Sequence, residues 1–145
     1  MQNSVPLHKE TGVLMTTITI PELRKRLYGL NKEIVPRMKE TFDSRICPRV
    51  EAKAKENCTP GMSPYWKAPF DTGLLRASIT TDAYVSENLV IATLSNPLDY
   101  ASFVHDGTSR MPPRPFLLDA VIDSRDQIWQ DIADTLGVIL KEATK

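Results

Sequence analysis

The segment that decides the fold is ASITTDAYVSENLVIATLS, residues 77–95. Two runs rich in Thr, Val and Ile, Ala77–Tyr84 and Leu89–Ser95, flank the turn residues Ser86-Glu87-Asn88. This pattern is typical of a β-hairpin. Because successive side chains of a strand point to opposite faces, one face of the first strand carries Ile79, Thr81, Ala83 and Val85, and one face of the second carries Val90, Ala92 and Leu94.

The residues on either side of this hairpin predict further sheet. Thr72-Gly73 is expected to let the chain turn sharply into the first strand, and Asn96-Pro97 closes the hairpin. A third strand is expected at Tyr100–His105, ending at the turn Asp106-Gly107, where glycine permits a positive φ. The prediction is a small antiparallel sheet of three or more strands within residues 73–106.

Helical patterns flank the predicted sheet. Residues 21–57 carry apolar residues at steps of three and four, namely Leu23, Leu27, Leu30, Ile34, Met38, Phe42, Ile46 and Val50. Pro36 and Pro48 are expected to kink or restart this run, giving two or three helical pieces in line. Residues 116–143 predict a second helix with the stripe Leu118, Val121, Ile122, Ile128, Trp129, Ile132, Leu136, Ile139 and Leu140. The expected fold class is therefore α+β, with long helices on a small sheet.

The other segments are rich in turn residues. Residues 58–72 are predicted to form a loop. We expect its aromatic side chains to pack on the core, which is their commoner fate; they are Tyr65, Trp66 and Phe70. Residues 107–115 form a loop stiffened by proline that carries two arginines. Residues 1–20 predict a poorly ordered leader, and translation can start at Met1 or at Met15. We expect a single domain at 21–145.

The composition limits the classes of function. Eighteen basic residues balance eighteen acidic ones, whereas non-specific DNA binding needs clustered Lys and Arg. We therefore expect no tight DNA binding, and a nucleic-acid-binding module is a weaker alternative. No apolar run approaches the ~20 residues of a membrane helix, so no membrane partner is expected. Cys47 and Cys58 are expected to be reduced thiols.

His105 is the one candidate residue for catalysis, and it stands beside Asp106 in the sequence. No obvious nucleophile lies near it in the chain. Neighbours in a strand point to opposite faces, so these two side chains are not assumed to pair. The glycines are scattered singly and form no phosphate-binding loop, and no spacing of His, Cys or Asp suggests zinc. We expect no catalytic, cofactor-binding or metal-binding residues, and a small hydrolase using His105 is the competing class.

Three clusters remain that folding alone does not explain. They are Asp71–Ile79 (DTGLLRASI), Tyr100–Thr108 (YASFVHDGT) and Pro115–Ala120 (PFLLDA). In this order they resemble the phage tail components that complete the tail and join it to the head, with the patterns T-G-x-L-R-x-S-I, Y-A-x-x-V-x-x-G-T and P-F-L-x-x-A. The resemblance covers residues 71 to about 121. His105-Asp106 departs from the family, in which an acidic residue and an aromatic precede Gly-Thr.

The resemblance implies a structural virion protein of the neck or tail, made in the host cytoplasm. Copies would form a six-fold ring around the DNA channel and contact other neck and tail proteins, and a tail terminator or a head-side connector is the alternative within this class. The expected fold-keeping residues are Thr72, Gly73, Leu75, Ser78, Tyr100, Gly107, Thr108, Pro115 and Phe116. The candidate residues of the subunit interface are Arg76, His105, Asp106, Arg110 and Arg114.

Overall fold

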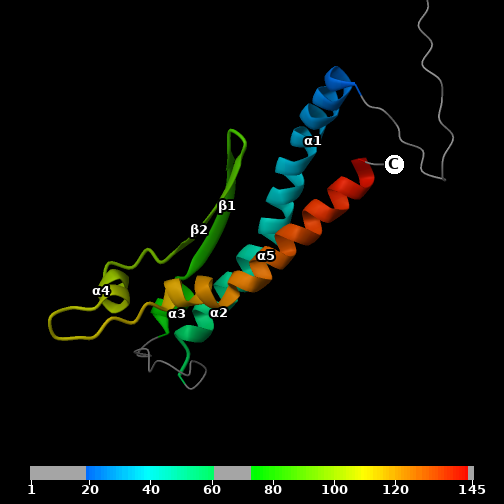
Figure 1. Ribbon diagram of the computed structural model, residues 1–145. Coiled ribbons are helices and arrows are strands. Elements are labelled where there is room, and N and C mark those ends of the chain that lie inside the picture. The colour runs from blue at the N-terminus through cyan, green and yellow to red at the C-terminus, as the bar shows by residue number, and fades with distance from the viewer. Residues whose placement is uncertain (1–18, 61–72, 144–145) are drawn as a thin grey trace, which may run out of the picture.

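The computed structural model describes residues 19–60 and 73–143 (Figure 1). Residues 1–18 of the predicted leader and residues 61–72 lie outside the described residues. Several residues singled out in the sequence fall in these two segments, namely Met15, Tyr65, Trp66, Phe70 and Thr72.

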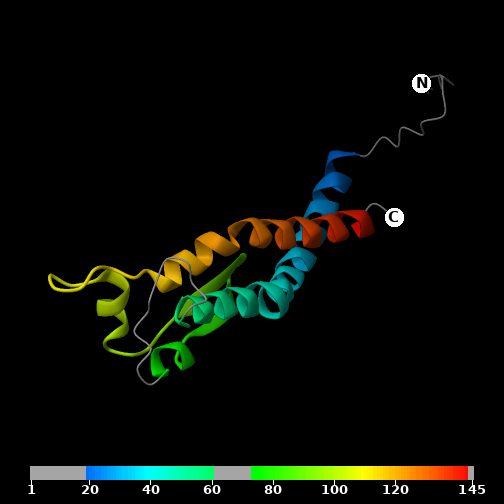
Figure 2. The same ribbon diagram turned by 90° about the horizontal axis from the view of Figure 1, so that it is seen from below.

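The N-terminal region is helical from Ile20 to Asn57. It consists of helix α1 (Ile20–Thr41), a π-helix (Phe42–Ile46) and helix α2 (Cys47–Asn57). The chain stays helical through Pro36, which lies inside α1, whereas Pro48 lies in the first turn of α2. Helix α2 continues directly from the π-helix, so Pro48, which has no backbone N–H to donate, lies at the junction of two helical types and does not end the helical run. Figure 2 shows α1 and α2 meeting at a bend.

The predicted hairpin is confirmed. Strands β1 (Thr80–Ser86) and β2 (Leu89–Ser95) pair antiparallel, with Ala83 opposite Ala92. On the predicted face of the first strand, which carries Ile79, Thr81, Ala83 and Val85, the residues Ile79 and Ala83 are buried in the core. Figure 1 shows the turn between β1 and β2 pointing away from the end of the molecule where α2 lies.

The predicted third strand at Tyr100–His105 is wrong, and the sheet of the described residues has two strands. This segment forms helix α4 (Ala101–Asp106). Its buried residues, Ala101 and Val104, are three positions apart and so share one helix face. The aromatic side chains that suggested a strand, Tyr100 and Phe103, are exposed.

The turn at Gly73 also differs from the expectation. Gly73 has a φ of 72° and precedes a short helix, α3 (Leu74–Ala77), rather than a strand. The sheet expected within residues 73–106 is therefore confined to residues 80–95, with one helix on either side of it in the chain. Gly107 has the expected positive φ, 79°, but it follows a helix.

The C-terminal helix α5 (Phe116–Ala143) has its predicted bounds, but of its predicted apolar stripe only Ile139 is fully buried. Most of the predicted stripe lies in solvent, including Leu118, Val121, Ile122, Trp129 and Leu140. The buried face consists of Phe116, Ala120, Ser124, Asp131 and Ile139. Small residues on this face let α5 approach α2 closely. None of the helices in the described ranges is long and apolar enough to cross a membrane.

Candidate functional site

The three sequence clusters meet in one hydrophobic core at the base of the molecule. Each cluster contributes two buried residues, and α2 adds Ala54 and Cys58. We call this group the motif core, and its cluster residues are Leu75 and Ile79, Ala101 and Val104, and Phe116 and Ala120. The segments 73–79, 100–108 and 115–120 are therefore neighbours in space although they are separated in the chain. Leu75 and Phe116 are both buried in this core.

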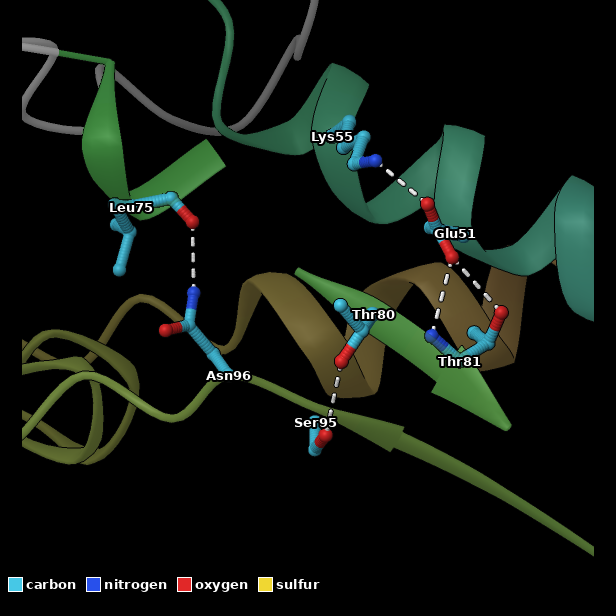
Figure 3. Close-up of polar contacts among 7 residues, drawn as sticks. All are labelled: Glu51, Lys55, Leu75, Thr80, Thr81, Ser95 and Asn96. Carbon is cyan, nitrogen blue, oxygen red and sulfur yellow. Dashed lines mark hydrogen bonds and ion pairs between the residues drawn. The ribbon is translucent and has the colours of Figure 1, made fainter. Parts of the chain in front are cut away.

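Two asparagine side chains bind the backbone of these segments. Asn96 donates from Nδ2 to the Leu75 carbonyl at 2.7 Å and accepts from the Leu98 N–H at 3.1 Å (Figure 3). The buried Asn57 donates from Nδ2 to the Phe116 carbonyl at 3.1 Å. Because an unpaired buried carbonyl is costly, these contacts hold the motif segments in place. Asn96 was recognised in the sequence only as a turn residue, and Asn57 gave no signal.

Glu51 joins α2 to the hairpin. Its carboxylate accepts from the backbone N–H and the hydroxyl of Thr81, at 3.1 and 2.9 Å, and from Lys55 at 2.6 Å (Figure 3). Lys55, followed by Thr81, holds the pKa of Glu51 below its ordinary value, against the opposing effect of burial. The sequence did not identify Glu51, because its partner is thirty positions away in the chain.

Four of the five predicted interface residues lie together in one segment, residues 101–115, which we call the α4 projection. His105 and Asp106 belong to α4, and Arg110 and Arg114 to the loop that follows. Figure 1 shows α4 and this loop standing to one side of the helices and the hairpin. The fifth, Arg76, is exposed on α3, where its charge acts on the Cys58 thiol.

Backbone hydrogen bonds fix the loop of the α4 projection. The Arg114 N–H donates to the carbonyls of Val104 and His105, both at 3.0 Å. Thr108 and Met111 exchange two backbone bonds, and the Thr108 hydroxyl also accepts from the Met111 N–H. The loop is thus tied back to α4 at Arg114 and closed on itself between Thr108 and Met111.

Gly107 is required by the same packing. A Cβ placed on Gly107 would lie 2.6 Å from the Pro113 nitrogen and 2.8 Å from the Met111 carbonyl oxygen. Its φ of 79° is also unfavourable for other residues. The glycine therefore allows the loop to fold closely over the end of α4.

The other fold-keeping residues have local roles. Ser78 follows α3 and donates its N–H to the Leu74 carbonyl at 2.9 Å, and Tyr100 precedes α4 with its carbonyl accepting from the Val104 N–H at 3.1 Å. The Pro115 carbonyl accepts from the Asp119 N–H at 2.8 Å at the start of α5.

The His105 and Asp106 side chains form a pair, contrary to the sequence expectation. Nδ1 of His105 lies 2.8 Å from Oδ1 of Asp106. The residues lie on a helix rather than a strand, so their side chains need not point to opposite faces. The His105 ring also packs edge-on against Phe116, with centroids 5.5 Å apart.

A small open pocket of about 230 Å³ adjoins this pair and includes Ser102. Ser102 and His105 share no hydrogen bond in the described part of the chain, whereas a serine nucleophile needs a base within that reach. Within the same residues, no group of three or more His, Cys, Asp or Glu side chains could hold a metal ion.

Both cysteines are free and buried. Burial raises the pKa of the Cys58 thiol to about 11, and it also raises that of Cys47. A thiol reacts as the thiolate, so neither group has the character of a nucleophile at neutral pH.

Comparison with known proteins gives no match, since no family, no curated protein and no solved structure is significantly similar to this chain.

Proposed function

We propose that the protein is a structural component of the neck or tail of a long-tailed bacteriophage, located in the virion. It completes the head-proximal end of the tail and joins it to the head, and it acts without catalysis. The observation that carries the proposal is the convergence of the three clusters in the motif core. Motifs that define one fold are expected to meet in space, and isolated chance matches are not.

The surface of the molecule supports an assembly role. The α4 projection presents charged side chains, including Asp106 at the end of α4 and Arg110 on the following loop, which is stiffened by prolines and tied by hydrogen bonds. A rigid projection loses little conformational freedom when it binds. In the described residues each strand of the hairpin also has one unpaired edge, which can accept a strand from another protein.

Copies of the chain would form a ring, six-fold in this proposal, around the DNA channel. Head-to-tail contacts close into a ring when the rotation between copies divides a full turn. The balance of eighteen basic and eighteen acidic residues suits a conduit, because a strongly basic wall would retain DNA. Purified protein is accordingly expected to bind duplex DNA negligibly at physiological salt.

A stop codon early in the gene tests the proposal directly. Capsids should still form and fill with DNA, and tails of near-normal length should accumulate unattached in the lysate, as seen by electron microscopy. The reason is that head and tail present different ring surfaces, which an adaptor must match. Intact infectious particles would refute the proposal. Empty heads would favour a head-side connector, and absent or overlong tails would favour a terminator.

The His105–Asp106 pair and the nearby Ser102 are the observation that favours a second candidate, a small hydrolase. Purified protein should be assayed against activated esters, with His105→Ala as the variant. We expect no turnover in either protein. Turnover that disappears in a folded His105→Ala variant would establish the hydrolase instead.

A further inference from the structure

Helix α5 carries an exposed apolar stripe. Leu118, Ile122, Trp129 and Leu140 are exposed, and Ile132 and Leu136 between them are half-buried. At 3.6 residues per turn these six positions fall on one side of the helix, separated by three, four or seven residues, the spacing of residues that recur on one helix face. We call them the outer stripe. Trp129, 64% exposed, is its largest side chain.

Among the described residues, no other helix lies beside the first turns of α1. Arg37 of α1 forms an ion pair with Glu142, only one residue before the end of α5. Figures 1 and 2 show the beginning of α1 diverging from the end of α5. We call Ile20–Glu33 the α1 overhang. Its described side chains are all exposed except that of Leu30, which is half-buried.

The α1 overhang can accept a partner helix. It is about 20 Å long at a rise of 1.5 Å per residue, and it is the N-terminal part of the 22-residue helix α1. Ile20 is 82% exposed and Tyr28 64% exposed, so apolar surface remains uncovered along it. The outer stripe is about 33 Å long by the same rise, long enough to receive the whole overhang.

The two surfaces have opposite charge. The α1 overhang contains four basic and two acidic residues, whereas α5 contains two basic and six acidic residues. Asp126 lies beside the outer stripe and is exposed, whereas Asp123 lies toward α2, with its carboxylate 4.0 Å from Nζ of Lys53. Two α5 helices placed against each other would bring like charges together, which disfavours pairing of stripe with stripe.

We propose that the α1 overhang of one copy packs along the outer stripe of α5 in a second copy. Each copy then offers one donor helix and one acceptor helix at different places, so the contact runs head to tail. Such contacts can continue from copy to copy and close into a ring. The inference takes from the proposed function only that copies of this chain assemble.

Cross-linking of two separate variants tests the pairing. Tyr28→Cys protein is mixed in turn with Leu118→Cys, Ile122→Cys or Leu140→Cys protein under mild oxidation, at concentrations up to millimolar. We expect disulfide-linked dimers in at least one mixture and none with either variant alone. The native thiols do not compete, because both are buried with a raised pKa.

Sedimentation of the full chain provides a second measurement. Trp129→Glu should weaken self-association at least about tenfold, the usual effect of losing a central aromatic anchor. Gln127→Glu is the matched control, because it adds the same charge two positions away, on an exposed site outside the stripe. High salt should weaken association of the native chain, because the paired surfaces have opposite charge.

Three results would overturn the inference: dimers formed by an α5 variant alone, no dimers in any mixture, or equal effects of Trp129→Glu and Gln127→Glu. These outcomes are independent of the gene-disruption experiment. Cross-linking as expected, together with normal virions after disruption, would refute only the phage function. Unattached heads and tails without cross-linking would refute only this contact.

Discussion

The two sides of α5 differ in how closely burial follows hydropathy. The inner side is buried and combines Phe116 and Ile139 with the small and polar residues Ala120, Ser124 and Asp131, whereas much of the outer stripe is exposed although it carries Ile122 and Trp129. The inner residues are buried because α2 lies against them closely, and Asp131 has Arg49 of α2 as its ion-pair partner. The comparison teaches that helix burial follows the shape and charge of the partner as well as side-chain hydropathy.

The largest predicted effect is a difference in stability between alanine variants at two positions near the start of α5. Phe116 is 2% exposed in the motif core, and Phe116→Ala is expected to lower the free energy of unfolding by about 3–5 kcal/mol. Leu118→Ala, on the outer stripe, should change it by less than about 0.5 kcal/mol in the monomer. Denaturant titration at low protein concentration measures both. Equal losses would show that the outer stripe is packed within one copy.

A larger side chain should destabilise the protein at one alanine of α5 and leave its stability nearly unchanged at another. Ala120 has no exposed surface, and Ala120→Leu is expected to cost about 1–3 kcal/mol by overpacking the contact with α2. Ala133 is exposed, so Ala133→Leu should be close to neutral. Thermal unfolding of the two variants checks this. A neutral Ala120→Leu would mean that the helices are not closely packed.

Removal of a buried aspartate should lower the stability of the protein more than removal of an exposed one. Asp131→Ala leaves the Arg49 guanidinium without its partner, and we expect a loss of about 1–2 kcal/mol, moderated because Arg49 is partly exposed. Asp126→Ala, on the outer side, should cost less than about 0.5 kcal/mol. The difference should shrink when Arg49→Met is also introduced. A difference independent of residue 49 would contradict the ion pair as its cause.

The smallest predicted effect on stability concerns two glutamates of α2. Glu51 faces the hairpin, and Glu56 faces solvent. The pKa of Glu51 is lowered in the fold, chiefly by Lys55, so its contribution is full at neutral pH and declines as the pH falls below the ordinary value of about 4.3. Glu51→Gln should cost about 1 kcal/mol at pH 7 and less at pH 3. Glu56→Gln is the control, and an equally pH-dependent loss there would contradict the assignment.

The hairpin and both long helices could be predicted because their signals are local. The turn residues at 86–88 and the alternation in residues 77–95 specify the hairpin, and the helical repeat specifies α5 with its bounds at Phe116 and Ala143. The motif clusters were also visible, since each is a short contiguous segment.

The segment Tyr100–His105, predicted as a strand, contains residues of high strand propensity, but Ala101–Asp106 forms the short helix α4. In so short a segment, burial of Ala101 and Val104 against the core outweighs propensity. Similarly, no local signal distinguishes Asn57, Asn96 or Glu51 from surface residues, because their partners are distant in the chain.

The sequence by itself therefore determined the elements and the three clusters, because both follow from periodicity and short motifs. Only the tertiary structure decided which side of α5 is buried and that the clusters converge. Amphipathic periodicity marks an apolar side but does not say what will cover it. Here the close approach of α2 and the charge of Arg49 select the other side, and the apolar side remains exposed in the single chain.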